Sequence, residues 1–241
     1  MIQMNRFFNI LTITALSLLL MNMLKPRIEP LYLHQRIITQ TNNLRNSVSE
    51  WANIYYSDQD VDYIPVIMRM TDFYLPLILN DFGVKSSKRV VIIVYSDSAR
   101  FQTDVGQMDV LPMGAYSGSV IRIVSPSLWM TNAYNAYAKD YFIQYGPLIH
   151  EIVHYAADLC VRKTLKPWLS EGLALYYEYK YTGVEWRPDL AEKASKISMN
   201  DLNNNFRQID ERVAYRKAFD AVRVFVRNHG EDKLQQFLRQ S

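Results

Sequence analysis

The sequence predicts an α+β fold with a small mixed sheet and a helical C-terminal part, preceded by an N-terminal transmembrane helix. Three observations lead to this prediction. Residues 90–95 form a β-branched run typical of a buried strand, apolar residues recur with helical spacing after residue 213, and residues 7–24 carry no charge. We therefore expect a membrane segment followed by one folded domain.

Length and composition support a single domain with a short attachment. The chain has 241 residues, of which 49% are hydrophobic, enough for a sizeable core. Its net charge is +3 and no basic stripe is present, so nucleic acid is not an expected partner. Cys160 is the single cysteine, which excludes an intramolecular disulfide, and we expect it to be a small core residue.

Residues 1–30 are predicted to contain an uncleaved signal anchor. As a helix, the uncharged run 7–24 would be about 27 Å long, just enough to cross the hydrocarbon core of a bilayer. Residues 21–24 read Met-Asn-Met-Leu and lack the small residues of a cleavage site. We expect a single-pass protein of the cell membrane with its folded domain outside the cytoplasm. Secretion after cleavage of the signal is the alternative, because the flanking charges do not fix the orientation.

Residues 31–50 are predicted to form a stalk or lead-in helix, and residues 51–241 the folded domain. The helical prediction rests on an apolar stripe between residues 34 and 52, formed by Ile37, Ile38, Leu44, Val48 and Trp51. A strand is expected to follow at 52–56.

The next segments alternate between helix and strand. A helix is expected at 62–82, with a kink at Pro76 and a C-terminal cap at Gly83. The run 90–95 is predicted to be a buried central strand, because its residues are apolar without alternation. We expect a short helix at 96–102 and, further on, one strand over 115–124.

The C-terminal half is predicted to be helical. A helix is expected within 133–162, entered at Gly146-Pro147, and a second one from Pro167 to about Tyr181, ended by Thr182-Gly183. Two last helices are expected after residue 213, separated at Gly230.

Residues 150–154 read His-Glu-Ile-Val-His, a pattern that points to zinc. Histidines four apart on a helix lie on one face, so His150 and His154 can both reach one zinc ion. Glu151 would point to the side where a water on the metal would lie. The alternative is an ordinary helix with two partly exposed histidines and one acid.

A catalytic zinc site needs a third protein ligand and an open fourth position. Glu171 is the best candidate, and Glu178, seven residues on, is the fallback ligand on the same helical face. Alternatively, Glu171 is an acid favoured in the first turn by the helix dipole. Asp158, four residues past His154, could hydrogen-bond a ligand histidine or simply be solvated.

A family resemblance rests on two motifs, His150-Glu151-x-x-His154 and Trp168-x-x-Glu171-Gly172-x-Ala174-x-Tyr176. They resemble those of the gluzincin metallopeptidases, most closely the bacterial peptidase MA-like domains. Similar segments at 54–56, 90–95, 114–116 and 215–237 extend the resemblance over roughly residues 51–240.

The resemblance implies a zincin-like metallopeptidase fold with one Zn²⁺ per chain, held by His150, His154 and Glu171. It implies a membrane-anchored peptidase that hydrolyses peptide bonds of a peptide or protein substrate by a metal-activated water, with Glu151 as the base. Related domains have a tyrosine near Tyr215, which would donate to the developing oxyanion or would merely pack.

The segment before the zinc motif bears on the type of peptidase. Gluzincins use the strand before the zinc helix as a sheet edge for the substrate's main chain. Aminopeptidases of this clan read Gly-Ala-Met-Glu-Asn there, whereas residues 114–118 read Gly-Ala-Tyr-Ser-Gly. The acid that would bind a free amine is absent, so an endopeptidase is expected.

Two other functions are compatible with the sequence. One is a catalytically silent, membrane-tethered binding or structural module that keeps the fold, and the other is a zinc hydrolase acting on something other than peptides. The sequence fixes neither the substrate nor the oligomeric state.

Overall fold

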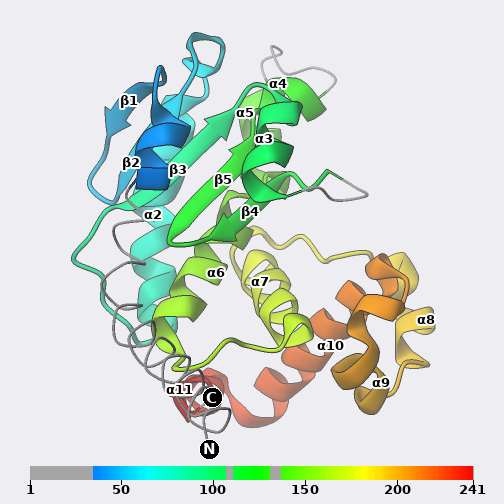
Figure 1. Cartoon of the computed structure of the whole chain (residues 1–241). Helices are drawn as coiled ribbons and strands as arrows, with labels where there is room; N and C mark the ends of the chain where they lie inside the picture. Colours follow the sequence, from blue (N-terminus) through cyan, green and yellow to red (C-terminus); the bar gives the residue numbers. More distant parts are fainter. Residues whose placement is uncertain (1–34, 107–110, 131–136, 241) are drawn as a thin grey trace, which may run out of the picture. The chain divides into compact units, whose positions relative to one another are not determined.

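The structure, a computed structural model, describes residues 35–106, 111–130 and 137–240 (Figure 1). The chain divides into two compact units, the first from Met1 to Asn43 and the second from Leu44 to Ser241. The described part of the first unit is helical over 35–41. The predicted signal anchor, residues 7–24, lies outside the described residues. Where the chain is described, no helix is long and apolar enough to cross a membrane.

A mixed sheet and a helical C-terminal part confirm the predicted α+β class. Within the described residues the sheet has five strands in the order β1-β2-β3-β5-β4, and β3 pairs in parallel with both β2 and β5. The outer strands β1 and β4 pair antiparallel with their neighbours. The strands are β1 Arg45–Val48, β2 Ala52–Tyr56, β3 Val90–Tyr95, β4 Gly114–Ser117 and β5 Val120–Val124.

The central position of β3 confirms the prediction made for residues 90–95. Five of its six residues are buried, and only Val91 is partly exposed. A parallel strand with neighbours on both sides is covered on both faces, which is why its residues read as a continuous apolar run. The strand prediction for 52–56 is confirmed as β2.

The predicted helix over residues 34–52 is correct only for its first part. Residues 45–48 form strand β1 instead, paired with β2 in a register that places Arg45 opposite Tyr56. Asn43, in the turn that ends the helix, has a φ of 68°, a left-handed conformation that cannot continue a helix. Pairing with β2 by main-chain hydrogen bonds is more favourable for this segment than a helix, because the helix would bury little apolar surface.

The single strand predicted at 115–124 is also wrong, because the segment is the hairpin β4–β5. Gly118 and Ser119 have φ values of 56° and 60°, as a two-residue turn of the I′ type requires at both central positions. The turn reverses the chain and places β4 at one end of the sheet. This position leaves the outer edge of β4 without a strand partner within the described residues.

Helices complete the fold, and the longer ones lie at positions that the sequence indicates, whereas no helix was predicted at 126–129, 191–195 or 199–205. The helices predicted at 62–82 and 96–102 are confirmed as α2 and α3, and Val84 N–H donates to Leu79 O (2.9 Å) in the capping turn at Gly83. The helices are α2 Ile64–Asp81, α3 Ser98–Val105, α4 Pro126–Trp129, α5 Ala138–Tyr145, α6 Leu148–Cys160, α7 Pro167–Thr182, α8 Ala191–Ser195, α9 Met199–Asn205, α10 Glu211–His229 and α11 Glu231–Gln240, with short 3₁₀ turns η1 Asp58–Asp60, η2 Pro188–Leu190 and η3 Phe206–Gln208.

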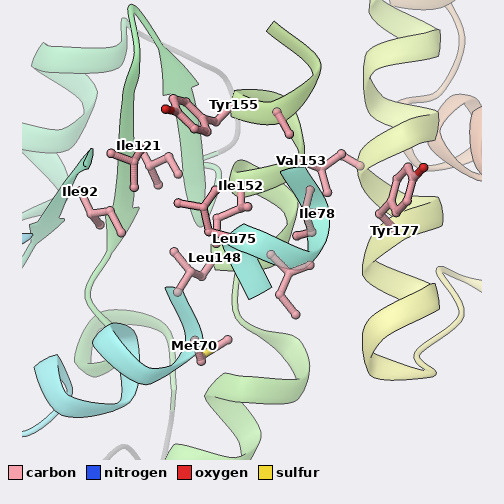
Figure 2. Packing of buried hydrophobic residues seen from close by; sticks show 14 of the residues in the cluster. Met70, Leu75, Ile78, Ile92, Ile121, Leu148, Ile152, Val153, Tyr155 and Tyr177 are labelled. Carbon is pink, nitrogen blue, oxygen red and sulfur yellow. The ribbon is translucent and has the colours of Figure 1, made fainter. Parts of the chain in front are cut away.

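The core lies where α2 and α6 pack on the sheet. Figure 2 shows Leu75 and Ile78 of α2 beside Ile152 of α6, together with Ile92 and Ile121 from the sheet. All five side chains are fully buried. Cys160 is buried at the end of α6, which confirms its predicted place in the core.

Helix α7 packs between α6 and α10 (Figure 1). Gly172 makes the contact with α10 possible, because a Cβ atom at this position would lie 2.6 Å from the carbonyl oxygen of Ala218. Real Cβ atoms do not approach a backbone oxygen so closely. The glycine therefore sets the distance between these two helices.

We expect Gly172→Ala to destabilise the protein by about 1–3 kcal/mol, because the added methyl group must push α7 and α10 apart. In an uncrowded helix the same change stabilises by roughly 0.5–1 kcal/mol. Chemical denaturation of the two proteins measures the difference, and Gly172→Ser should lose more stability than Gly172→Ala. A gain in stability for Gly172→Ala would contradict the close helix contact.

Candidate metal centre

Two neighbouring helices bring the predicted metal ligands together. Helix α6 begins directly after Pro147, as predicted, and carries His150 and His154 on one face. Helix α7 carries Glu171, whose Oε2 atom lies 3.2 Å from His150 Nε2 and 3.8 Å from His154 Nε2. One ligand atom from each of the three residues lies within 4.8 Å of the others, so this group could hold a metal ion.

The far nitrogen of each imidazole ring has a partner of its own. His150 Nδ1 lies 3.3 Å from Glu178 Oε2, and His154 Nδ1 lies 3.0 Å from Ser170 Oγ. Metal-binding histidines normally have such a partner, because it fixes the ring and leaves the other nitrogen free to coordinate. Both Nε2 atoms therefore face the Glu171 carboxylate, an arrangement that fits a metal between them.

Glu178 consequently has a different role from the fallback ligand considered on sequence grounds. It shares the predicted face of α7 with Glu171, but it reaches the Nδ1 atom on the far side of the His150 ring. Its helical register carries it about two turns along α7, past the point where the two Nε2 atoms converge. The structure thus gives Glu178 the place of an orienting carboxylate.

Of the two alternatives considered for Asp158, the structure supports the solvated acid, because its side chain is exposed and has no hydrogen bond to a histidine among those of the described residues. Its carboxylate accepts a hydrogen bond of 2.7 Å from the Tyr116 hydroxyl, and Tyr116 belongs to β4. Asp158 is one turn further along α6 than His154, which brings it beside the end strand of the sheet. The bond ties β4 to the helix that carries the histidines.

Burial and mutual charge set the protonation of the three ligands. Burial alone would lower the pKa of His150, but the carboxylates of Glu171 and Glu178 outweigh it and raise that pKa well above its usual value. Burial, with the neighbouring His150, lowers the pKa of His154 to about 4. Burial opposes ionisation of Glu171, yet its interactions with both histidines hold its pKa below the usual value. Near neutral pH, His154 and Glu171 are thus already in the forms that bind a metal.

Glu151 is a buried acid on the flank of this group, with 4% of its surface exposed. Burial raises its pKa to about 7; His150 acts against the shift, while Glu171 and Glu178 add to it. Gly114 of β4 touches this carboxyl, since a Cβ atom there would lie 2.7 Å from Glu151 Oε1. Only a glycine lets the strand pass so close to the acid.

Tyr215 reaches the group from α10. Burial, and then the neighbouring Glu171 carboxylate, raise the pKa of its hydroxyl, so the hydroxyl lies close to this carboxylate. The side chain also packs against the rings of Trp186 and Phe206. The packing stated as one alternative for this residue is therefore observed, whereas donation to a developing oxyanion stays a prediction.

Sequence reasoning missed several residues of this site. No pattern in the sequence indicates the contact of Ser170 with His154. The only available signal is its position next to Glu171, because a helix that directs Glu171 toward α6 can direct the preceding residue there as well. Trp186 and Phe206 lie in a polar stretch without periodicity, so no sequence signal indicated them.

Comparison with protein-family models and with curated proteins finds no match for the chain. The gluzincin resemblance therefore rests on the motif residues.

The purified protein should bind roughly one equivalent of a divalent metal per chain, and His154→Ala should lose it, because a ligand is removed. The matched control is His229→Ala, which deletes an exposed histidine at the end of α10 that contacts the Phe225 ring. Elemental analysis after dialysis against a weak chelator measures the metal content per chain of the parent and of both variants. Equal metal contents in the two variants would exclude this group as the binding site.

Proposed function

We propose that the protein is a membrane-anchored zinc peptidase with a zincin-like fold, more suited to internal peptide bonds than to chain ends. The observation that supports it best is the convergence of His150, His154 and Glu171 with a buried, ionisable Glu151 beside them. A metal site alone needs no such acid. A hydrolase needs it as the group that takes a proton from water.

Zinc is the metal that suits these donors. Two neutral imidazole nitrogens and one carboxylate are the ligands of one common class of catalytic zinc site, which keeps its fourth position open. Harder metals such as Mg²⁺ favour oxygen ligands, whereas imidazole suits zinc. The partners on both Nδ1 atoms support the same assignment, because they prepare each ring to coordinate through Nε2.

Bound zinc would lower the pKa of a water molecule and polarise the scissile carbonyl group. The protein's own residues would carry out the proton transfers. Glu151 would accept the proton of the attacking water and donate it to the leaving amine. Tyr215 would donate its hydroxyl hydrogen to the carbonyl oxygen as negative charge develops there, from its place beside Glu171.

Strand β4 is the proposed docking edge for a peptide or protein substrate. Its outer edge can accept an extended chain by main-chain hydrogen bonds, and it packs along α6. Because Gly114 lies against Glu151, a peptide paired with this strand would pass the metal group closely. No acid in residues 114–117 is available to hold a free amino terminus, which favours an endopeptidase.

The membrane part of the proposal rests on the uncharged run 7–24. A single-pass anchor with the folded domain outside the cytoplasm would direct the enzyme to substrates at or beyond the membrane surface.

Glu151→Gln should keep its zinc but lose turnover by roughly 10²–10⁴-fold, because the amide cannot accept the proton of water. Cleavage of a protein substrate and metal analysis are measured on the same sample. Glu192→Gln is the matched control and should leave the rate unchanged, since Glu192 of α8 is an exposed acid paired with Lys196 just after this helix. If Glu151→Gln cleaves as fast as the parent, Glu151 is not the base. A zinc-loaded parent that cleaves nothing in a broad peptide library would favour the silent binding module instead.

The pH profile of kcat/KM should have an acidic limb set by Glu151, which is active only when ionised. Its pKa is raised to about 7 by burial, and a zinc ion nearby would lower it again, so the limb should lie at or below about 7. Activity is therefore present above this pKa and is lost as the pH falls through it. Rates from about pH 4 to about pH 9 measure the limb. A profile that stays flat down to about pH 4 would contradict the assignment.

A further inference from the structure

The Tyr215 ring contacts two aromatic side chains from outside its own helix. Phe206, in η3, stacks on it with ring centres 5.9 Å apart and an interplanar angle of 23°. Trp186, in the segment after α7, contacts it with ring centres 6.3 Å apart and an angle of 45°. Stacking on the ring limits its rotation about the side-chain bonds, and so limits where the hydroxyl can point.

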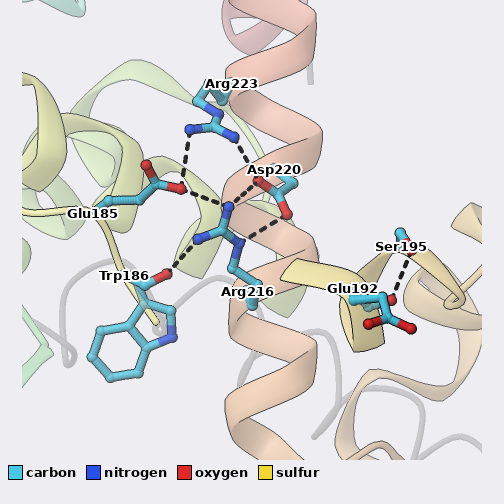
Figure 3. A network of polar contacts seen from close by, with 7 residues as sticks. All are labelled: Glu185, Trp186, Glu192, Ser195, Arg216, Asp220 and Arg223. Carbon is cyan, nitrogen blue, oxygen red and sulfur yellow. Dashed lines mark hydrogen bonds and ion pairs between the residues drawn. The ribbon is translucent and has the colours of Figure 1, made fainter. Parts of the chain in front are cut away.

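A buried arginine fixes the segment that carries Trp186. Arg216, the next residue after Tyr215, is 2% exposed and donates to the backbone oxygen of Trp186 (2.8 Å). Its guanidinium also pairs with Glu185 (2.7 Å) and binds both carboxylate oxygens of Asp220 (2.9 Å each), as Figure 3 shows. Such a bidentate pair defines geometry as well as adding energy. The position of Trp186 is therefore defined relative to α10.

The network has a second arginine at its outer side. Arg223, about two turns further along α10, lies 3.2 Å from Glu185 and 3.2 Å from Asp220 (Figure 3). Each of the two acids thus pairs with both arginines, and the two negative charges balance the two positive charges around the buried Arg216. Figure 3 also shows the indole of Trp186 beside the Arg216 helix.

Two hydrogen bonds connect the segment that carries Phe206 to the start of α7. Asn203 of α9, three residues before Phe206, accepts hydrogen bonds from Lys166 Nζ (2.7 Å) and Trp168 Nε1 (3.1 Å). Lys166 and Trp168 stand at the start of α7, the helix that carries Glu171. The α9–η3 segment thus contacts the Glu171 helix through Asn203 and the Tyr215 ring through Phe206.

From these contacts we infer that Trp186 and Phe206 are positioning residues, which hold the Tyr215 hydroxyl at the Glu171 carboxylate. A free tyrosine side chain samples several rotamers, and confining it to one of them costs conformational entropy. Because the two rings confine it in the folded protein, this entropy is not lost when a ligand binds. The catalytic consequence rests on the proposed function, because it assumes that Tyr215 serves the reaction. The placement of the hydroxyl at a metal ligand does not depend on that assumption.

Deleting one ring should act on turnover more than on substrate binding. We expect Phe206→Ala to lower kcat by about 10-fold with KM nearly unchanged, because an interaction used in the transition state loses its geometry. Phe206→Tyr and Trp186→Phe keep a ring and should retain most of the activity. Phe73→Ala is the matched control, since Phe73 is an exposed ring packed on Tyr74 in α2, and it should change neither constant.

A double-mutant cycle decides whether Phe206 acts through Tyr215. Phe206→Ala, Tyr215→Phe and the double variant are compared with the parent. If Phe206 only positions the Tyr215 hydroxyl, the double variant loses no more than Tyr215→Phe alone. Independent, additive losses would overturn the inference. Phe206→Leu serves for the same cycle if thermal unfolding shows that Phe206→Ala does not fold.

The affinity for zinc gives a second readout that needs no catalysis. Partners of metal ligands typically contribute roughly 10–100-fold to metal affinity, so Tyr215→Phe should weaken zinc binding in a chelator competition by about 10-fold, the lower end of that range. Phe206→Ala should weaken it in the same direction, again without an added loss in the double variant. Additive losses of affinity would overturn the inference, whatever the activity. Coupled losses in a protein that cleaves no peptide would leave the inference standing and overturn the proposed function.

Discussion

The approach of the Glu171 carboxylate to the two Nε2 atoms across the contact between α6 and α7 is the interaction on which the rest of the site depends. The two histidines come together by helical spacing alone, but the carboxylate comes from a separate helix and must be placed by packing. Buried Val153 of α6 and Tyr177 of α7 belong to the same core cluster that supports this contact. The absence of a side chain at Gly172 then lets α10 approach α7 and bring Tyr215 to the same point.

Burial gives these groups their chemical character. Acids and histidines placed together out of water would destabilise the fold unless they were paired, and here each ionised group faces a partner of opposite or complementary character. His150 is held between two carboxylates, whereas Glu151 lies to the side and has its pKa raised by burial. The same low-polarity environment therefore gives two adjacent residues of α6 different protonation behaviour, because His150 has two carboxylate partners and Glu151 has none among the described residues.

Much of the fold, and the motif residues of the site, could be predicted from the sequence because they depend on local rules. The continuous apolar run of β3, the capping glycine after α2 and the i, i+4 histidines each follow from the periodicity or backbone freedom of a few adjacent residues. The strand β1 and the β4–β5 hairpin could not be predicted in this way. The first owes its conformation to its partner strand, and the second to a turn at Gly118 and Ser119 that interrupts an otherwise strand-like segment.

By itself, then, the sequence was enough to select the three residues that could hold a metal ion, since spacing on one helix and one downstream motif point to His150, His154 and Glu171. Only the tertiary structure decided which residues surround that group: Glu178 and Ser170 at the far ring nitrogens, Asp158 at Tyr116 instead of at a histidine, and Trp186 and Phe206 around Tyr215. The physical reason is that a helical period relates residues a few positions apart. The partners of a buried polar group are chosen by packing between segments that lie far apart in the chain.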